Sequence, residues 1–190
     1  MKTLLLSATA LVLSAALPAL AQSPAPAAAS PAAAGAAPAS MSEPIGVTMR
    51  SADGKSHGTI RITETPNGVI VDGDLTDLED GEYGLHFHAK GVCEGNFDSA
   101  GGHHNPTDKQ HGFEVEGGPH AGDMANIYVQ GGKARFQQFN PMVRFASGDA
   151  PLKDADGTAI MVHGSADDHH SQPTGNAGSR MACGVVFPAS

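Results

Sequence analysis

GLHFHAKGVCEGNFDSAGGHHNPTDKQHGFEVEGGPHAGD, residues 84–123, is the stretch around which we expect the rest of the chain to be arranged. It begins as a short strand and continues as a long loop without a periodic apolar pattern. Six of the ten histidines and one of the two cysteines lie in it. Long loops in compact domains are usually functional or disordered. The histidines favour a function, because a metal ion can order them.

The first pair of candidate ligands is His86 and His88, on either side of Phe87. Successive side chains of a strand alternate between its two faces, so both imidazoles point one way and Phe87 points into a core. Such a pair suits copper or zinc. The alternative is two surface histidines on a polar strand face, because a first-row metal site needs three or four ligands.

The loop offers a second set of ligands, His103, His111, His120 and Asp123. Three imidazoles and one carboxylate can complete a tetrahedral zinc site. The intervening glycines allow the backbone to fold tightly around an ion, although they suit a disordered linker equally well. From these residues alone, both a metal site and a solvated polar loop remain open.

The sequence before this domain has two parts. Residues 1–21 have a basic start, an apolar run and an Ala-x-Ala cleavage pattern at residues 19–21, which predict a secretory signal peptide. An uncleaved anchor is the alternative. Residues 22–43 are almost entirely Ala, Pro and Ser, which indicates a flexible linker. We therefore place the folded domain at residues 44–190 and expect the protein to be exported, in a bacterium to the periplasm.

The domain itself consists of short β-branched or alternating runs separated by Gly, Asn and Asp. Eight such runs predict an all-β sandwich or barrel, and no helix is indicated. The runs are IGVTMRS, TIRITET, GVIVDGDL, YGLHFHA, MANIYVQ, ARFQQF, TAIMVHG and ACGVVF.

The cysteines and the net charge narrow the function further. In an exported protein, Cys93 and Cys183 predict one disulfide, whereas a cytosolic location would favour free thiols or thiolate ligands. The formal net charge of −9 argues against nucleic acid and anionic membrane surfaces as partners. An anionic substrate would need a local positive field. We expect no stable membrane insertion after removal of the leader.

Six motifs occur in a familiar order: GLHFHAKGVC, SAGGHHNP, KQHG, GPHAGD, MVHG and GNAGSRMACGVV. In these motifs the chain resembles the Cu,Zn superoxide dismutases, from about Ile45 to Phe187. The resemblance implies an eight-stranded Greek-key β-sandwich or flattened barrel, with a long metal-binding loop and a second active-site loop. It also implies one copper and one zinc per chain, and dismutation of superoxide to oxygen and hydrogen peroxide.

The resemblance assigns a role to each matching residue. It implies copper ligands His86, His88, His103 and His163, and zinc ligands His103, His111, His120 and Asp123. His103 would bridge the two metals and carry a proton. Asp167 would accept hydrogen bonds from a copper ligand and a zinc ligand, expected to be His86 and His111, although its neighbour Asp168 could take this position. Arg180 would lie over the copper and attract superoxide.

The second loop departs from the family pattern. The segment from His163 to Arg180 is short, and Pro173 occupies the place of a steering lysine. Three lysines, Lys90, Lys109 and Lys133, are candidates to replace it. The oligomeric state does not carry over from the family, whose dimer-forming surfaces differ among members, so monomer and homodimer both stay open. Two alternative functions stay open here, a metal-binding module without turnover and a structural domain of the cell envelope.

The remaining histidines and methionines receive ordinary structural interpretations. We expect His57 to face solvent, His104 to neighbour the bridging residue, and His169 and His170 to lie in a solvated loop. Met124, Met161 and Met181 are expected in the core.

Overall fold

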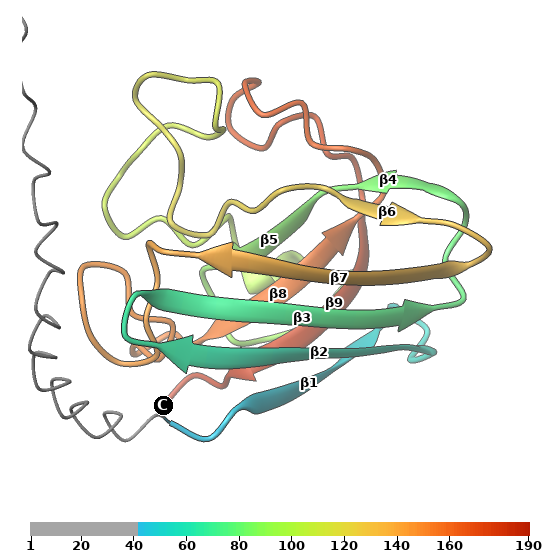
Figure 1. Cartoon of the computed structure of the whole chain (residues 1–190), viewed down its shortest axis with the longest axis horizontal. Helices are drawn as coiled ribbons and strands as arrows, with labels where there is room; N and C mark the ends of the chain where they lie inside the picture. The colour runs from blue at the N-terminus through green and yellow to red at the C-terminus, as the bar shows by residue number, and fades with distance from the viewer. Residues whose placement is uncertain (1–41) are drawn as a thin grey trace, which may run out of the picture. The chain divides into compact units, whose positions relative to one another are not determined.

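A computed structural model describes residues 42–190 (Figure 1). The predicted leader and nearly all of the predicted linker lie outside this range. Within it are nine β-strands and one three-residue 3-10 helix, so the predicted all-β class is confirmed. The elements are β1 Ile45–Arg50, β2 Ser56–Thr65, β3 Gly68–Thr76, β4 Gly81–Tyr83, β5 Leu85–His88, η1 Asp98–Ala100, β6 Ile127–Val129, β7 Lys133–Asn140, β8 Thr158–His163 and β9 Arg180–Phe187. No helix among these residues is long and apolar enough to cross a membrane.

Seven of the strands form one curled antiparallel sheet in the order β5-β8-β9-β1-β2-β3-β7. The short strands β4 and β6 pair with each other, and β6 also packs near β7. Two long loops, one after β5 and one after β8, extend from the strands side by side (Figure 1). They are joined by backbone hydrogen bonds such as Glu114 N to His169 O, 3.0 Å.

The predicted run Tyr83–Ala89 forms two strands rather than one, which raises the number of strands from eight to nine. The chain changes partners at Gly84: β4 pairs with β6, whereas β5 pairs with β8. Gly84 itself donates its N–H to Ser165 O at 2.8 Å and accepts a bond from His163 N at 2.9 Å. Periodicity could not reveal this break, because the alternation of side chains continues across it.

Strand β8, which lies between β5 and β9 in the sheet, is buried along its whole length. Its side chains alternate, so Ile160 and Val162 enter the main core while Ala159 and Met161 enter a second, smaller cluster. The other buried members of the second cluster are Phe97, Ala100 and Cys183. The loop after β5 therefore covers the outer face of β8, and this covered face is where the site is built.

Cys93 and Cys183 form the predicted disulfide, with a Cα–Cα distance of 5.9 Å. Cys183 lies on β9 opposite Met161 of β8, so the bridge ties the loop directly to the sheet. Met161 and Met124 are buried in the core as expected, and Met181 is partly buried against it.

Replacing both cysteines with alanine is expected to lower the free energy of unfolding by about 4–5 kcal/mol, because the bridge closes a loop of 90 residues. Urea unfolding of metal-depleted protein measures this. The reduced parent should behave like the double variant. A variant as stable as the oxidised parent would show that the bridge does not restrict the unfolded chain.

Candidate metal centre

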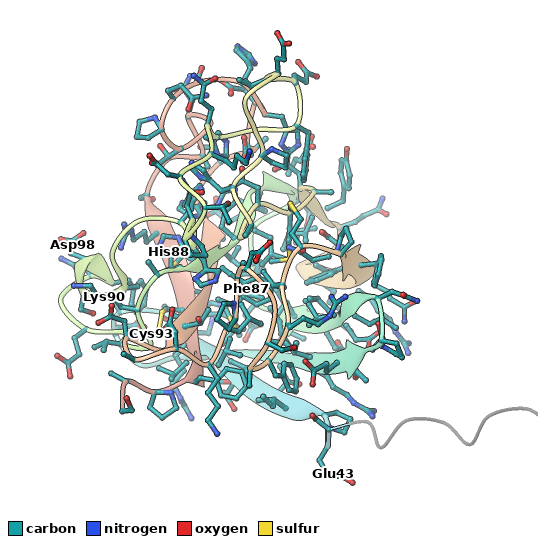
Figure 2. All side chains as sticks on the ribbon, turned by 90° about the vertical axis from the view of Figure 1, so that its left-hand side faces the viewer. Glu43, Phe87, His88, Lys90, Cys93 and Asp98 are labelled. Carbon is teal, nitrogen blue, oxygen red and sulfur yellow. A yellow bond between two sulfur atoms is a disulfide. The ribbon has the colours of Figure 1, made fainter. Side chains whose placement is uncertain are left out.

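The histidine pair on β5 lies as the strand alternation predicts. His86 and His88 are 0% and 1% exposed, and Phe87 between them is fully buried in the main core. His86 pairs with Met161 of β8. His163 follows Met161 by two residues, so its side chain projects from the same face of β8. Both imidazoles of β5 and that of His163 therefore lie on the face covered by the loops. Figure 2 labels Phe87 and His88 in the interior of the molecule.

Backbone pairing with the free edge of β5 brings in two of the loop residues. Isolated β-bridges link His88 to His103 and His86 to Asp123. Phe87 donates its N–H to Gly122 O at 2.9 Å and accepts one from His104 N at 2.8 Å. A side chain at Gly122 would collide with the Phe87 carbonyl, so this close approach requires glycine.

The first group of candidate ligands consists of buried imidazoles only. They are His86, His88, His103 and His163, with ligand atoms within 4.8 Å of one another. His88 Nε2 lies 3.2 Å from His163 Nε2. His86 Nδ1 and His103 Nε2 are buried and have no hydrogen-bond partner. Buried polar atoms are normally paired, so these free nitrogens fit a bound metal ion, and four imidazoles suit copper.

The second group adds a carboxylate. It contains His103, His111, His120 and Asp123, again with ligand atoms within 4.8 Å of one another. Asp123 Oδ1 lies 3.0 Å from His103 Nδ1 and 3.1 Å from His111 Nδ1. His120 Nδ1 lies 3.4 Å from His103 Nδ1. Ligands about 2.0–2.1 Å from a tetrahedral zinc are about 3.3 Å apart, so the donor set fits zinc.

Asp167 contacts one imidazole of each group. Its Oδ2 is 2.6 Å from His86 Nε2, and its Oδ1 is 3.0 Å from His111 Nε2. Each ring therefore donates its N–H to Asp167 and turns its other nitrogen toward a candidate metal position. Asp168 instead accepts bonds from the backbone of His170 and Ser171, so the structure places Asp167 between the two rings.

Two further residues support this arrangement and were not found from the sequence. Gln172 holds the metal loop with its side chain, accepting from His111 N and donating to His111 O, both at 2.8 Å. Gly175, at φ 62, leaves room for Asp167 and His111 to meet, where any side chain would collide with both. The sequence assigned neither residue a role, because both act through contacts with His111, which lies in the other loop.

Burial keeps most of the imidazoles neutral, as metal ligands must be. It lowers the pKa of His103 to about 4 and that of His163 to about 3. His111 differs, because hydrogen bonds to Asp123 and Asp167 outweigh burial and raise its pKa to about 9. The pKa values of Asp123 and Asp167 lie well below the ordinary range of a carboxyl group. Burial acts to raise them, but the hydrogen bonds from the imidazoles outweigh it.

Arg180 lines a surface cavity with Ala52, Asn96, Asp98, Gly178 and Ser179. It is the one cationic side chain among these residues, and Asp98 is the one anionic side chain. None of the three lysines proposed as replacements lines this cavity. In Figure 2, Asp98 and Lys90 lie at the left-hand edge of the molecule.

The structure corrects one of the remaining assignments. His57 does not face solvent: it is 7% exposed, and its Nδ1 lies 3.2 Å from Thr76 O. His104 neighbours His103 as expected and is buried. His170 is exposed and His169 partly exposed, and neither joins a candidate metal group within residues 42–190.

Comparison with known proteins identifies the family. The family sequence model described as copper/zinc superoxide dismutase (SODC) matches residues 56–186. The chain belongs to the copper/zinc superoxide dismutase family. It is therefore a superoxide dismutase, an oxidoreductase whose cofactors are copper and zinc.

Curated superoxide dismutases support this assignment. The copper-zinc enzyme of Caulobacter vibrioides is 40% identical over 143 residues, which cover 73% of this chain and 82% of that protein. Superoxide dismutase (Cu-Zn) 2 of Aquifex aeolicus is 41% identical over 140 residues, covering 72% of this chain and 82% of the relative.

Solved structures agree on the fold of this superoxide dismutase. A double mutant of a superoxide dismutase-like protein from Bacillus subtilis matches with a TM-score of 0.72 and 36% identity, covering 75% of this chain and 96% of that one. The Cu/Zn superoxide dismutase from Brucella abortus matches with a TM-score of 0.64 and 28% identity, covering 76% and 99%.

The metal-depleted superoxide dismutase is expected to lose stability as the pH falls from 7 to 5. His103 and His163 have folded pKa values below the unfolded value of 6.5, so the unfolded chain takes up more protons as the pH falls. Each contributes a loss of about 2 kcal/mol over this range. The raised pKa of His111 adds stability below about 9 that changes little below pH 6.5.

Urea unfolding of the metal-depleted protein at pH 7, 6 and 5 measures the effect. The variant His170→Ala, which removes an exposed histidine, serves as the control and should follow the parent. Stability that stayed constant or rose toward pH 5 would show that the buried rings take up protons in the folded state.

Proposed function

We propose that the first group of imidazoles holds copper, that the second group holds zinc, and that His103 bridges the two ions. Copper, when bound, supplies the one-electron chemistry that oxidises one superoxide to oxygen and reduces another to hydrogen peroxide. Zinc has no redox chemistry and suits a structural and electrostatic role. Each chain would carry one ion of each kind.

The observation that carries this proposal is the position of His103. Its Nδ1 faces Asp123 in the second group, its Nε2 is buried without a hydrogen-bond partner, and the residue is also a member of the first group. No other residue belongs to both four-membered groups. One imidazole with two separately directed nitrogens suits a bridge between two metals, and Nε2 is also the atom that can hold and release a proton during turnover.

The other residues have orienting or attracting roles. Asp167 holds His86 and His111 in one orientation through Nε2, which leaves Nδ1 of His86 without a partner and directs Nδ1 of His111 toward Asp123 in the second group. Arg180 supplies positive charge at the cavity, where it attracts the superoxide anion and orients it for reaction. Because the chain is acidic overall, this local charge is what favours an anionic substrate.

We also propose that the protein is exported and protects the cell envelope from superoxide. The disulfide between Cys93 and Cys183 supports an oxidising compartment. The leader pattern of residues 1–21 supports export to the periplasm. A homodimer is part of the same proposal, and sedimentation of the mature protein tests it.

Replacement of the bridge tests the metal assignment. His103→Ala is expected to lose most superoxide-consuming activity, and its Cu(II) absorption should no longer respond to removal of zinc. Copper and zinc are quantified by elemental analysis on the same samples, and His170→Ala is the control. A parent protein whose Cu(II) spectrum is insensitive to zinc removal would overturn the bridge.

Substitutions that remove or reverse the charge at position 180 test the role of Arg180. Arg180→Ala is expected to lower the second-order rate with superoxide by about tenfold, and Arg180→Glu should lower it further, because local fields change encounter rates by roughly 10–10³-fold. Both variants should respond less than the parent to added salt. Pulse radiolysis at two ionic strengths measures the rates.

The matched control for this charge test is Arg135→Ala. It removes the same charge from an exposed site on β7, which lines a different surface hollow. Its rate should stay close to that of the parent. If fully metallated Arg180→Glu reacted as fast as the parent, the attraction of superoxide would come from another group.

A further inference from the structure

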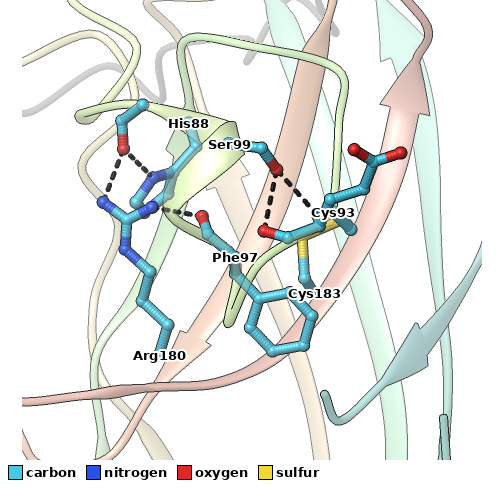
Figure 3. The surroundings of a disulfide bond; sticks show 8 residues. His88, Cys93, Phe97, Ser99, Arg180 and Cys183 are labelled. Carbon is cyan, nitrogen blue, oxygen red and sulfur yellow. Dashed lines mark hydrogen bonds between the residues drawn. A yellow bond between two sulfur atoms is a disulfide. The ribbon is translucent and has the colours of Figure 1, made fainter. Parts of the chain in front are cut away.

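The guanidinium of Arg180 is held by the backbone of one turn in the loop after β5. This loop carries Cys93 and is called the disulfide loop below. Arg180 Nη1 donates to Phe97 O and Arg180 Nη2 donates to Gly101 O, the latter at 2.6 Å (Figure 3). Gly101 O also accepts a bond from His88 Nδ1 at 3.1 Å. Arg180 and a candidate copper ligand therefore share one acceptor, and the position of this turn decides where the guanidinium lies.

The backbone of this turn has an uncommon conformation. Phe97 lies in the left-handed region with φ 70 and ψ 11, directly before helix η1. Non-glycine residues rarely adopt this conformation, and an aromatic residue gains nothing there from a local side-chain hydrogen bond. Such a conformation persists where the surrounding structure compensates for it. The direction of the Phe97 carbonyl depends on that compensation.

The ring of Phe97 supplies a compensating contact. It is 4% exposed and belongs to the second cluster, with Ala159 and Met161 of β8 and with Cys183. Cys93 packs against the same cluster. Figure 3 shows the ring next to the disulfide while the carbonyl of the same residue points to Arg180. Ring and carbonyl thus connect the buried face of β8 to the cavity at the surface.

A second contact closes the turn without involving the ring. Ser99 Oγ accepts a bond from Glu94 N at 2.7 Å and donates to Glu94 O at 3.0 Å. These bonds hold the ends of the segment together, but they do not contact Phe97 or Arg180. The Phe97 carbonyl also accepts a bond from Ala100 N at 3.1 Å, so this backbone bond and the buried ring together set its orientation.

We propose that Phe97 is a positioning residue for Arg180: burial of its ring beside the disulfide holds the left-handed turn, and the turn aims two carbonyl oxygens at the guanidinium. This inference rests on the role proposed above for Arg180. Phe97 does not line the cavity, so it would act through Arg180. Its side chain sets how precisely the positive charge is placed at the cavity.

Three substitutions separate the ring from the backbone. Phe97→Ala removes the ring and keeps an L-residue in the left-handed turn. Phe97→Gly also removes the ring, but it relaxes the backbone requirement, so the turn stays accessible without being fixed. Phe97→Leu keeps an apolar side chain for the cluster. Phe139→Ala is the control, because Phe139 is 53% exposed on β7.

The rate with superoxide is measured by pulse radiolysis on samples with equal copper and zinc content. Phe97→Ala and Phe97→Gly are expected to lose rate toward, but not beyond, the roughly tenfold loss of Arg180→Ala. Phe97→Leu should retain most of the parent rate. The two ring-less variants should also bind azide, a small anion that perturbs Cu(II) absorption, more weakly and with less dependence on salt.

A double-mutant cycle with Arg180→Ala decides the inference. In the Arg180→Ala background, removal of the ring should cause no further loss of rate. An equal loss in both backgrounds, or full rate in the ring-less variants, would overturn the positioning role. If Phe97→Ala fails to take up metals, Phe97→Gly carries the same cycle. A fully metallated parent without activity would instead overturn the proposed function.

Discussion

Backbone pairing between β5 and the loop that follows it is the constraint on which this structure depends. The loop returns along the free edge of β5, so that His103 and Asp123 lie beside His88 and His86. Strand geometry then places the side chains, because paired residues of neighbouring strands project to the same face. Gly122 makes the close approach possible, since a side chain there would meet the Phe87 carbonyl. The β-bridges thereby fix two residues of a long irregular loop relative to the sheet.

The same arrangement concentrates buried polar groups that the fold must satisfy. Two carboxylates, Asp123 and Asp167, accept hydrogen bonds from three of the imidazoles, namely those of His86, His103 and His111. These bonds orient the rings and leave chosen nitrogens free. Burial keeps His103 and His163 neutral, which is the state that binds metal. Desolvation therefore keeps these two rings neutral, while hydrogen bonds to the carboxylates orient His86, His103 and His111.

The disulfide loop links this interior to the surface. Its apolar residues cover the outer face of β8, and the carbonyls of the same segment hold Arg180 at the cavity. Because β8 is buried on both faces, its outer side chains need such a cover. The segment that covers β8 thus also holds Arg180 of β9, and the bridge between Cys93 and Cys183 fastens this segment to β9.

Several features follow from the sequence by itself. Alternation in short runs predicted the all-β class, the two cysteines predicted the bridge, and the spacing of His86 and His88 placed both rings on one face. Strand alternation and residue spacing can be read from the sequence because they depend only on residues close to one another in the chain. Only the tertiary structure decided the partner change at Gly84, the burial of His57, the contacts of Gln172 and the place of Phe97 beside Arg180. Each of these depends on segments far apart in sequence, and periodicity carries no information about which segments meet.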